Sequence, residues 1–236
     1  MKIGVVVFPG SNCDRDMIYV LRNILKQEVI ELWHKEKLLP EVDLVVLPGG
    51  FSFGDYLRSG AIARFSPLMT AVIDYAKNGG YVLGICNGFQ VLCESHLLPG
   101  ALRHNPSHRF VCKNTYLRPF SSNTAITAEL SSDRAYKIPV AHGEGSYFIE
   151  EEGLAALKEN QQILFQYCDA NGVVNESANF NGSTFNIAGV CNEGRNVFGM
   201  MPHPERAADP HLGNEDGRAL LESLLNQVSA QFNPAP

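Results

Sequence analysis

The segment from Tyr81 to Glu94, YVLGICNGFQVLCE, constrains the fold and function of this chain more than any other stretch. It begins with an apolar run, Tyr81 to Ile85, of the kind that buried parallel strands use. A helix is predicted to follow from Phe89 to Glu94. Between them, Gly84-Ile85-Cys86-Asn87-Gly88 has the spacing of a nucleophile elbow, the sharp strand-to-helix turn that presents a reactive side chain.

Cys86 stands at the corner of this predicted turn. The glycines on either side carry no Cβ, so the strand and the helix can approach each other closely. A helix N-terminus beside the sulfur supplies backbone N–H groups and a partial positive charge, which favour thiolate over thiol. A buried structural cysteine would also fit a helix start. The paired glycines, the strand and the helix together favour a catalytic nucleophile.

The rest of the pattern predicts a flavodoxin-like α/β fold, an open, mostly parallel sheet with helices on both faces. Apolar runs predict strands at 2–8, 29–33 and 42–47, and helical spacing predicts helices at 14–26, 68–76 and 215–231. The middle, about 109–196, has short alternating runs separated by turn signals, so we expect antiparallel strands appended to the same domain. We predict one domain over 1–236, with a frayed tail at 233–236.

Composition narrows the classes of function. The 236 residues are 45% hydrophobic and carry a net charge of −6, which argues against nucleic acid as a partner. No apolar run approaches the roughly 18 residues of a membrane span. Six cysteines show no CxxC pair and no regular framework, so we expect a reducing, cytoplasmic location without disulfides.

A nucleophilic cysteine needs a base and a group that orients the base. Near the C-terminus, His203 lies between two prolines in MMPHPER, and Glu205 follows two residues later. Residues i and i+2 of an extended segment project to the same side. The carboxylate can therefore fix the imidazole tautomer and stabilise its charged form, whereas without Cys86 this histidine would be interpreted as a surface residue of a Pro-rich loop.

Acyl transfer also needs hydrogen-bond donors aimed at the oxyanion. The backbone N–H of Asn87 follows the nucleophile directly, and Gly49-Gly50 ends the strand predicted at 42–47. Functional residues of parallel sheets gather beyond the carboxyl ends of the strands. Gly50 and Asn87 are therefore the predicted donors, although a Gly-Gly pair after a strand is on its own more often a plain turn.

Several longer segments carry a family resemblance: VVVFPGSNCDRD, VVLPGGFSFGDYLRSGAIARFSP, GGYVLGICNGFQVL, LLPGAL, PVAHGEGSY, NGSTFNIAGV and FGMMPHPERA. With them the chain resembles the class I, triad-type glutamine amidotransferases. It is most similar to the glutaminase subunits of phosphoribosylformylglycinamidine synthases, which serve purine biosynthesis. The resemblance extends from the first strand to about Ala207.

The resemblance implies a triad of Cys86, His203 and Glu205. Cys86 is expected to attack the side-chain amide of glutamine and form a thioester, with His203 as the general base and later the acid. Glu205 is implied as the third member. The product would be glutamate and ammonia.

The resemblance also implies the surroundings of the triad. Gly50 and Asn87 match oxyanion-hole positions, and Gln90 matches a position that helps to hold the glutamine substrate. The segment from His142 to Gly145 matches a stretch that lines the same pocket, with the individual roles of His142 and Glu144 left open.

Partners follow from the same resemblance. A larger ATP-using synthetase would use the ammonia to convert formylglycinamide ribonucleotide to formylglycinamidine ribonucleotide, together with a small accessory subunit. The chain has no GxxxxGK[ST] loop, so ATP and magnesium are expected on the synthetase, and no cofactor or metal on this chain. The Gly-rich loop PGGFSFGD around Gly50 can change conformation cheaply, so the isolated chain is expected to be a poor glutaminase until the partner binds.

Two places depart from the family pattern: Phe180 stands where Pro is expected in NFNGS, and Pro119-Phe120 replaces a more charged stretch. Neither is expected to touch the triad, so they bear on partner contacts rather than on chemistry.

Three alternatives remain open from the residues alone. One is another amidotransferase subunit or a cysteine hydrolase on the same fold. The second is a metal-binding module, since His104, His108 and Cys112 are spaced i, i+4 and i+8, but Pro106 interrupts that helix. The third is a noncatalytic binding protein of flavodoxin-like fold, which the presence of all the triad residues disfavours.

Overall fold

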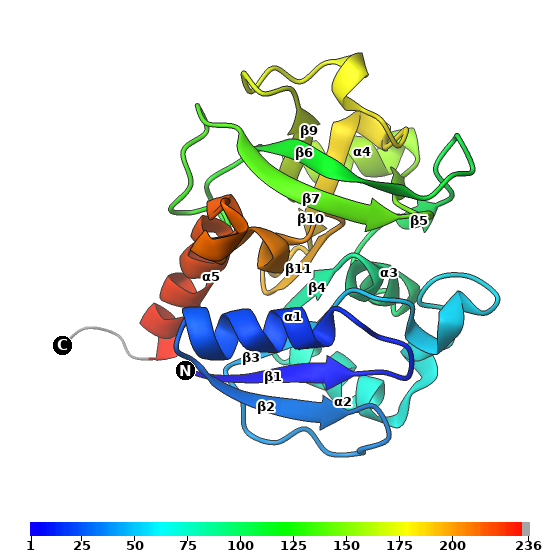
Figure 1. Ribbon diagram of the computed structural model, residues 1–236. Helices are drawn as coiled ribbons and strands as arrows, with labels where there is room; N and C mark the ends of the chain where they lie inside the picture. The colour runs from blue at the N-terminus through cyan, green and yellow to red at the C-terminus, as the bar shows by residue number, and fades with distance from the viewer. Residues whose placement is uncertain (233–236) are drawn as a thin grey trace.

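The structure is a computed structural model that describes residues 1–232; the predicted frayed tail at 233–236 lies outside the described residues (Figure 1). Its main sheet has nine strands in the order β2-β1-β3-β4-β11-β10-β9-β6-β7. In sequence these are β1 (Lys2–Val7), β2 (Glu28–Trp33), β3 (Leu44–Leu47), β4 (Tyr81–Ile85), β6 (Val111–Pro119), β7 (Tyr136–His142), β9 (Ile163–Cys168), β10 (Ile187–Cys191) and β11 (Val197–Met200).

The longer helices are α1 (Asp14–Tyr19), α2 (Pro67–Lys77), α3 (Asn87–Glu94), α4 (Glu151–Glu159) and α5 (Asp216–Phe232). The helix predicted at 14–26 changes at Val20 into a π-helical segment, Val20–Ile24, so it is not one regular helix. The other predicted helices agree with α2, α3 and α5 to within two residues.

The parallel half of the sheet is β2-β1-β3-β4-β11. Strands β3 and β4 are buried at every position, as their unbroken apolar sequences predict. The connection from β1 to β2 runs toward one edge and that from β3 to β4 toward the other. Right-handed crossovers therefore place α1 and α2 on opposite faces, which confirms the predicted fold class.

The antiparallel strands are not a separate layer but continue the same sheet. β11 pairs parallel with β4 and antiparallel with β10, and β9, β6 and β7 follow with antiparallel pairings. Figure 1 shows this half above the parallel half. Only β5 (Ala101–Arg103) and β8 (Ser146–Phe148) form a second, two-stranded sheet within the described residues.

The prediction for the middle region missed one element. It expected only antiparallel strands there, but α4 lies between β8 and β9. Of its sequence, EEGLAALKE, only Leu157 is buried. The helix therefore lacks the repeating pattern of apolar residues by which a helix is recognised in sequence.

The nucleophile elbow is present as predicted. A Cβ at Gly88 would lie 1.9 Å from the carbonyl oxygen of Leu47, and one at Gly84 would lie 2.5 Å from Leu92. Both glycines are therefore required for α3 to pack on β3 and β4. Cys86, between them, has φ 50° and ψ −106°, a conformation that is costly for a residue with a side chain.

The hydrophobic core runs through both halves of the sheet, from Ile3 on β1 to Val140 on β7. Across residues 1–232, no helix combines the length and the apolar character needed to cross a membrane. The main sheet runs without interruption from β2 to β7, so both halves of the described chain share one core.

Candidate active site

The carboxyl ends of four parallel strands meet at one point. Cys13 follows β1, Gly49 follows β3, Cys86 follows β4 and His203 follows β11. A Cβ at Gly49 would lie 2.6 Å from Cε1 of His203 and 3.3 Å from both Sγ of Cys13 and Cβ of Cys86. The missing side chain of Gly49 therefore lets three functional groups converge.

His203 and Glu205 form a buried pair. Nδ1 of His203 lies 2.6 Å from Oε1 of Glu205, and the two residues are 1% and 2% exposed. The backbone N–H of His203 donates to the carbonyl of Pro139 on β7 at 2.8 Å, and Pro204 begins a 3-10 turn that brings Glu205 back toward the ring. The structure thus brings together the two residues that the sequence predicted as base and orienter.

The electrostatics of this pair favour the imidazolium. Burial alone would lower the pKa of His203, but the negative charge of Glu205, that of an ionised Cys86 and the nearby sulfur of Cys13 together raise that pKa well above its ordinary value. Nε2 of His203 has no hydrogen-bond partner among the described residues. One ring nitrogen is therefore held by the carboxylate, and the other can exchange a proton with a reacting group.

The elbow turns Cys86 toward a small cavity. Its backbone N–H donates to the carbonyl of Met200 on β11 at 2.8 Å, and its Sγ lies 3.7 Å from the carbonyl oxygen of Ala141 on β7. Cys86 is 5% exposed and lines this cavity.

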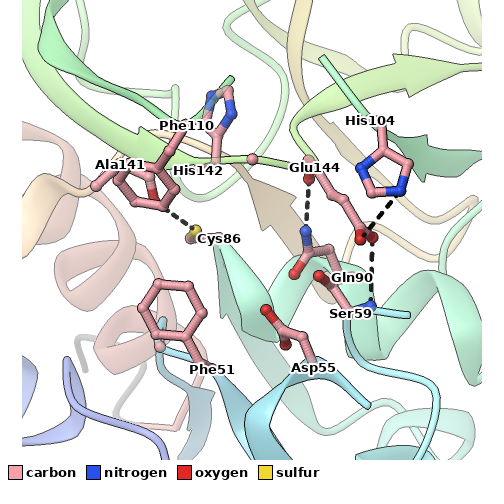
Figure 2. Close-up of a pocket in the computed structure, with 12 residues that line it drawn as sticks. Phe51, Asp55, Ser59, Cys86, Gln90, His104, Phe110, Ala141, His142 and Glu144 are labelled. Carbon is pink, nitrogen blue, oxygen red and sulfur yellow. Dashed lines mark hydrogen bonds and ion pairs between the residues drawn. The ribbon is translucent and has the colours of Figure 1, made fainter. Parts of the chain in front are cut away.

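This cavity has a volume of about 140 Å³ and is shown in Figure 2. It is lined by Gly50, Phe51, Asp55, Ser59, Cys86, Gln90, His104, Phe110, Ala141, His142, Gly143 and Glu144. The rings of Phe51 and Phe110, 6.1 Å apart, lie on the side of Cys86, while the carboxylates of Asp55 and Glu144 lie on the opposite side. The cavity is therefore apolar at one end and acidic at the other.

Asp55 is a pocket residue that the sequence reasoning did not single out, although it lies in the quoted segment GGFSFGDY. Burial chiefly raises its pKa to about 6, the charge of Glu144 adds to the rise, and hydrogen bonds from Ser59 and Asn87 oppose it. The side-chain amide of Asn87 donates to Oδ1 of Asp55 at 3.2 Å. Asp55 is thus a carboxylate that is ionised at neutral pH and titrates just below it.

Asn87 and Gln90 link the elbow to the neighbouring loops through hydrogen bonds. The Asn87 amide also donates to Oε1 of Gln90 at 3.0 Å and accepts from the backbone N–H of Ser52 at 3.2 Å. Nε2 of Gln90 donates to the carbonyl of Glu144 at 2.5 Å. Of the two predicted oxyanion donors, Gly50 lines the cavity and Asn87 follows Cys86 directly at the start of α3.

His142 is held in the cavity wall as a neutral ring. Burial and the positive charge of His203 lower its pKa to about 4. Its Nδ1 lies 3.1 Å from Oδ1 of Asn105, and its ring stacks on Phe180 at 6.0 Å between centroids. Phe180, one of the two departures from the family pattern, therefore supports a pocket residue, a contact that the sequence reasoning did not foresee.

The three residues of the metal-binding alternative do not gather at one place. The rings of His104 and His108 lie 5.8 Å apart, and His104 faces Glu144, with Nε2 3.6 Å from Oε1. Cys112 instead lines a separate cavity of about 650 Å³ that borders Glu205. Their sequence spacing does not translate into a shared ligand position.

Residues 1–219 match the family described as the CobB/CobQ-like glutamine amidotransferase domain. The chain belongs to the glutamine amidotransferase family. This amidotransferase is 54% identical over 228 residues to the phosphoribosylformylglycinamidine synthase subunit PurQ of Salinibacter ruber, with 97% of each chain covered. It is 55% identical over 226 residues to the protein of the same name from Aquifex aeolicus, with 96% of this chain and all of that one covered.

A solved structure agrees with these sequence relatives. The structure of PurLQS from Thermotoga maritima superposes on the amidotransferase with a TM-score of 0.84 and 40% identity, covering 96% of this chain and 98% of that one. At lower identity, 16%, a crystal structure of another glutamine amidotransferase from Thermotoga maritima shares the fold with a TM-score of 0.61, covering 97% of both chains. The relatives match the chain over nearly its whole length, in agreement with the family resemblance carried by its motifs.

Proposed function

We propose that the chain is the glutaminase subunit of a phosphoribosylformylglycinamidine synthase in de novo purine biosynthesis, and that residues 1–236 act as one amidotransferase domain. The names of the relatives at 54% and 55% identity support this. The observation that carries the chemistry is the buried pair of His203 and Glu205 beside Cys86, which lines a cavity.

Thioester formation follows from this geometry. Cys86 attacks the side-chain amide carbon of glutamine as the thiolate, and the C–N bond breaks after a tetrahedral intermediate. His203 gives its proton to the departing nitrogen, so that ammonia leaves as a neutral molecule. The backbone N–H groups of Gly50 and Asn87 are the proposed donors to the oxyanion, a contribution typically worth about 100- to 1,000-fold in rate per donor.

Hydrolysis then completes the cycle. His203, now neutral, takes a proton from a water molecule that attacks the thioester carbon, and Cys86 leaves as the thiolate. Glutamate is released, and His203 again carries the proton. Glu205 accepts from Nδ1 throughout, which fixes the tautomer and stabilises the charged ring.

Cavity size and charge favour glutamine over a peptide. A volume of about 140 Å³ is below the range of about 300 to 1,000 Å³ that drug-sized ligands occupy. The acidic end formed by Asp55 and Glu144 suits the α-ammonium group of a free amino acid. We infer that Gln90 shapes this pocket through its hydrogen bonds with Asn87 and Glu144, and not only by contacting the substrate directly.

The ammonia is proposed to pass to a larger ATP-using synthetase that makes formylglycinamidine ribonucleotide, assembled with a small accessory protein. The structural relative titled PurLQS supports such an assembly. We propose that ATP and magnesium bind to the synthetase, that this chain carries no cofactor, and that the protein acts in the cytoplasm.

A strained loop at the cavity offers a means of coupling to that partner. Phe53, Asp55 and Leu57 all have positive φ, which costs of order 1–3 kcal/mol for each such residue. Leu57 is 83% exposed. A partner that binds one conformation of this loop would shift the population of Gly50 conformations, within the limit of its differential affinity.

The test is glutamate release by the isolated chain, and then with synthetase, ATP and formylglycinamide ribonucleotide added. We expect low activity alone and strong activation in the complex. Cys86→Ala should abolish glutamate release and leave ammonia-dependent synthesis by the complex intact. Full activity in isolation, unchanged by the partner, would leave a stand-alone glutaminase instead.

A further inference from the structure

Cys13 is a second buried cysteine at the catalytic centre. It precedes α1, is 3% exposed, and its Sγ accepts a hydrogen bond from Nη2 of Arg206 at 3.0 Å. Its sulfur, a ring nitrogen of His203 and a carboxylate oxygen of Glu205 all lie within 4.8 Å of one another. Cys13 thus lies against the triad but does not line the glutamine cavity.

The guanidinium of Arg206 binds Asp16 and Cys13 rather than Glu205, its neighbour in sequence. Nε donates to Oδ2 of Asp16 at 3.1 Å, and Nη2 donates to Cys13. Glu205 is the preceding residue of the chain and the strongest acceptor nearby, yet its Oε2 is buried with no hydrogen-bond partner among the described residues. Its other oxygen, Oε1, contacts His203.

The charge of Glu205 nevertheless stabilises the charged form of Arg206. Burial opposes the charged guanidinium, but Cys13, Glu205 and Asp16 together raise the pKa of Arg206. A charge-assisted bond from an arginine to a carboxylate is stronger than one to sulfur. In the structure, Asp16 and Cys13 bind Nε and Nη2, and no hydrogen bond joins the guanidinium to Oε2 of Glu205.

We propose that Cys13 is a positioning residue of the glutaminase: its sulfur binds Arg206 and keeps the guanidinium off Glu205, leaving that carboxylate to His203 alone. The proposal rests on the proposed function for its catalytic meaning. It gives a role to a buried cysteine beside the triad that the mechanism does not use.

The position of the Arg206 guanidinium affects the pKa of His203. A guanidinium bound to Glu205 would neutralise the charge that raises the pKa of His203, so the imidazolium would be less stable. The pKa of His203 would therefore fall toward its ordinary value. The titratable and charged groups closest to His203 and Glu205 are Cys13, Cys86, His142 and Arg206. Asp16, Tyr19, Cys112 and Asp209 line the cavity that also borders Glu205 and Arg206.

A cation site is the rival interpretation of the same cluster. Sulfur, imidazole and carboxylate are metal-ligand types, but the positive guanidinium 3.0 Å from the sulfur opposes a cation there. The arrangement of Arg206 thus favours a role in orienting the side chains.

The experiment measures the pH titration of the His203 ring by NMR in the whole chain, with the signal of His203 identified by its absence in His203→Ala. The titration midpoint reports the stability of the imidazolium and needs neither glutamine nor synthetase. For Cys13→Ala we expect the midpoint to fall by about one pH unit, which makes the imidazolium about tenfold less stable relative to the neutral ring. Cys191→Ala, a fully buried cysteine on β10, is the matched control and should leave the midpoint in place.

Arg206 decides between positioning and mere packing. Arg206→Gln should restore the midpoint in the double variant with Cys13→Ala, because the competing guanidinium is gone. Cys13→Ser, which keeps an acceptor, should resemble the wild type. If the shift persists in the double variant, or Cys13→Ala leaves the midpoint unchanged, the proposal is wrong.

Asp16→Asn keeps the proposal testable if Cys13→Ala does not fold. Asp16 is half exposed, so the substitution should be tolerated, and it loosens the second anchor of Arg206. A smaller downward shift of the midpoint is expected, and no shift would count against the proposal. Since the readout is the titration of one ring, a chain that showed no glutaminase activity with the synthetase would overturn the proposed function and leave this result standing.

Discussion

Nδ1 of His203 lies 2.6 Å from Oε1 of Glu205, and Nε2 of the same ring is buried without a hydrogen-bond partner among the described residues. The ring is thus fixed at one nitrogen and available for proton transfer at the other. His203 and Glu205 are therefore expected to have different roles, so their substitutions should lower kcat by different amounts.

His203→Ala should lower kcat by about 10²- to 10⁴-fold, the range typical of general acid–base catalysis. Glu205→Gln should cost less, because it keeps the ring in place and removes only the charge that stabilises the imidazolium. Steady-state glutamate release by the activated complex measures both. Equal losses, or a larger loss at Glu205, would require the two roles to be reassigned.

A glutamine-like electrophile should label Cys86 alone among the six cysteines. Of these six, which all lie in the described part of the chain, Cys86 is the one that lines the cavity. Burial raises the pKa of Cys168 and of Cys191 to about 11, so these remain thiols at neutral pH. Peptide mapping after labelling measures the site.

Exposed Cys112 provides the internal control for that experiment. Free glutamine should protect Cys86 from the electrophile, and a general alkylating agent should still react with Cys112 in its presence. Label found chiefly on Cys13 or Cys93 would contradict the assignment of Cys86 as the nucleophile.

The KM for glutamine should rise as the pH falls below about 6. Burial raises the pKa of Asp55 to about 6, so below that pH the ionised form that attracts an α-ammonium group declines about tenfold per pH unit. Asp55→Asn should raise KM at about pH 7.5 and abolish this dependence. Asp74→Asn, an exposed carboxylate on α2, should behave as the wild type, and a KM unaffected by Asp55→Asn would show that the substrate ammonium binds elsewhere.

The free energy of unfolding should fall as the pH drops from 6.5 to about 4 because of His142. Its folded pKa of about 4 lies below its ordinary value of 6.5, so the unfolded chain binds more protons in this window. Linkage then lowers stability as the pH falls, by on the order of 3 kcal/mol across the window from this residue. Urea unfolding at several pH values measures the slope.

His142→Gln should flatten that slope, since it removes the titrating ring and retains a polar partner for Asn105. His96→Gln, the same change at an exposed position, is the matched control and should keep the wild-type slope. An unchanged slope in His142→Gln would place the acid sensitivity in another group.

The parts of the site that local sequence could predict are those with local causes. Gly84, Cys86 and Gly88 determine the elbow through their own steric needs, and the spacing of His203 and Glu205 brings the two groups together within one turn. Parallel strands of unbroken apolar sequence likewise predict the half of the sheet that holds them.

The parts that it missed depend on pairings between distant segments. Nothing local says that β11 pairs with β4 on one side and β10 on the other, so the sequence did not reveal that the antiparallel strands continue the main sheet. Cys13 and Arg206 lie 193 positions apart, and their contact exists only because β1 and β11 end at the same edge. Asp55 reaches the cavity through a loop with positive φ at three non-glycine residues, which no composition rule predicts.

The place of β11 between β4 and β10 also orders events on the ribosome. Synthesis runs from the N-terminus, so the elbow with its cysteine is made long before β11 and the proposed acid–base pair that follows it. A nascent chain that ends before Val197 has a complete β1-β3-β4 core but a vacant position in the middle of its sheet, and Cys86 lacks its proposed proton acceptor. Such a chain cannot act as a glutaminase before β11 has emerged and filled this position.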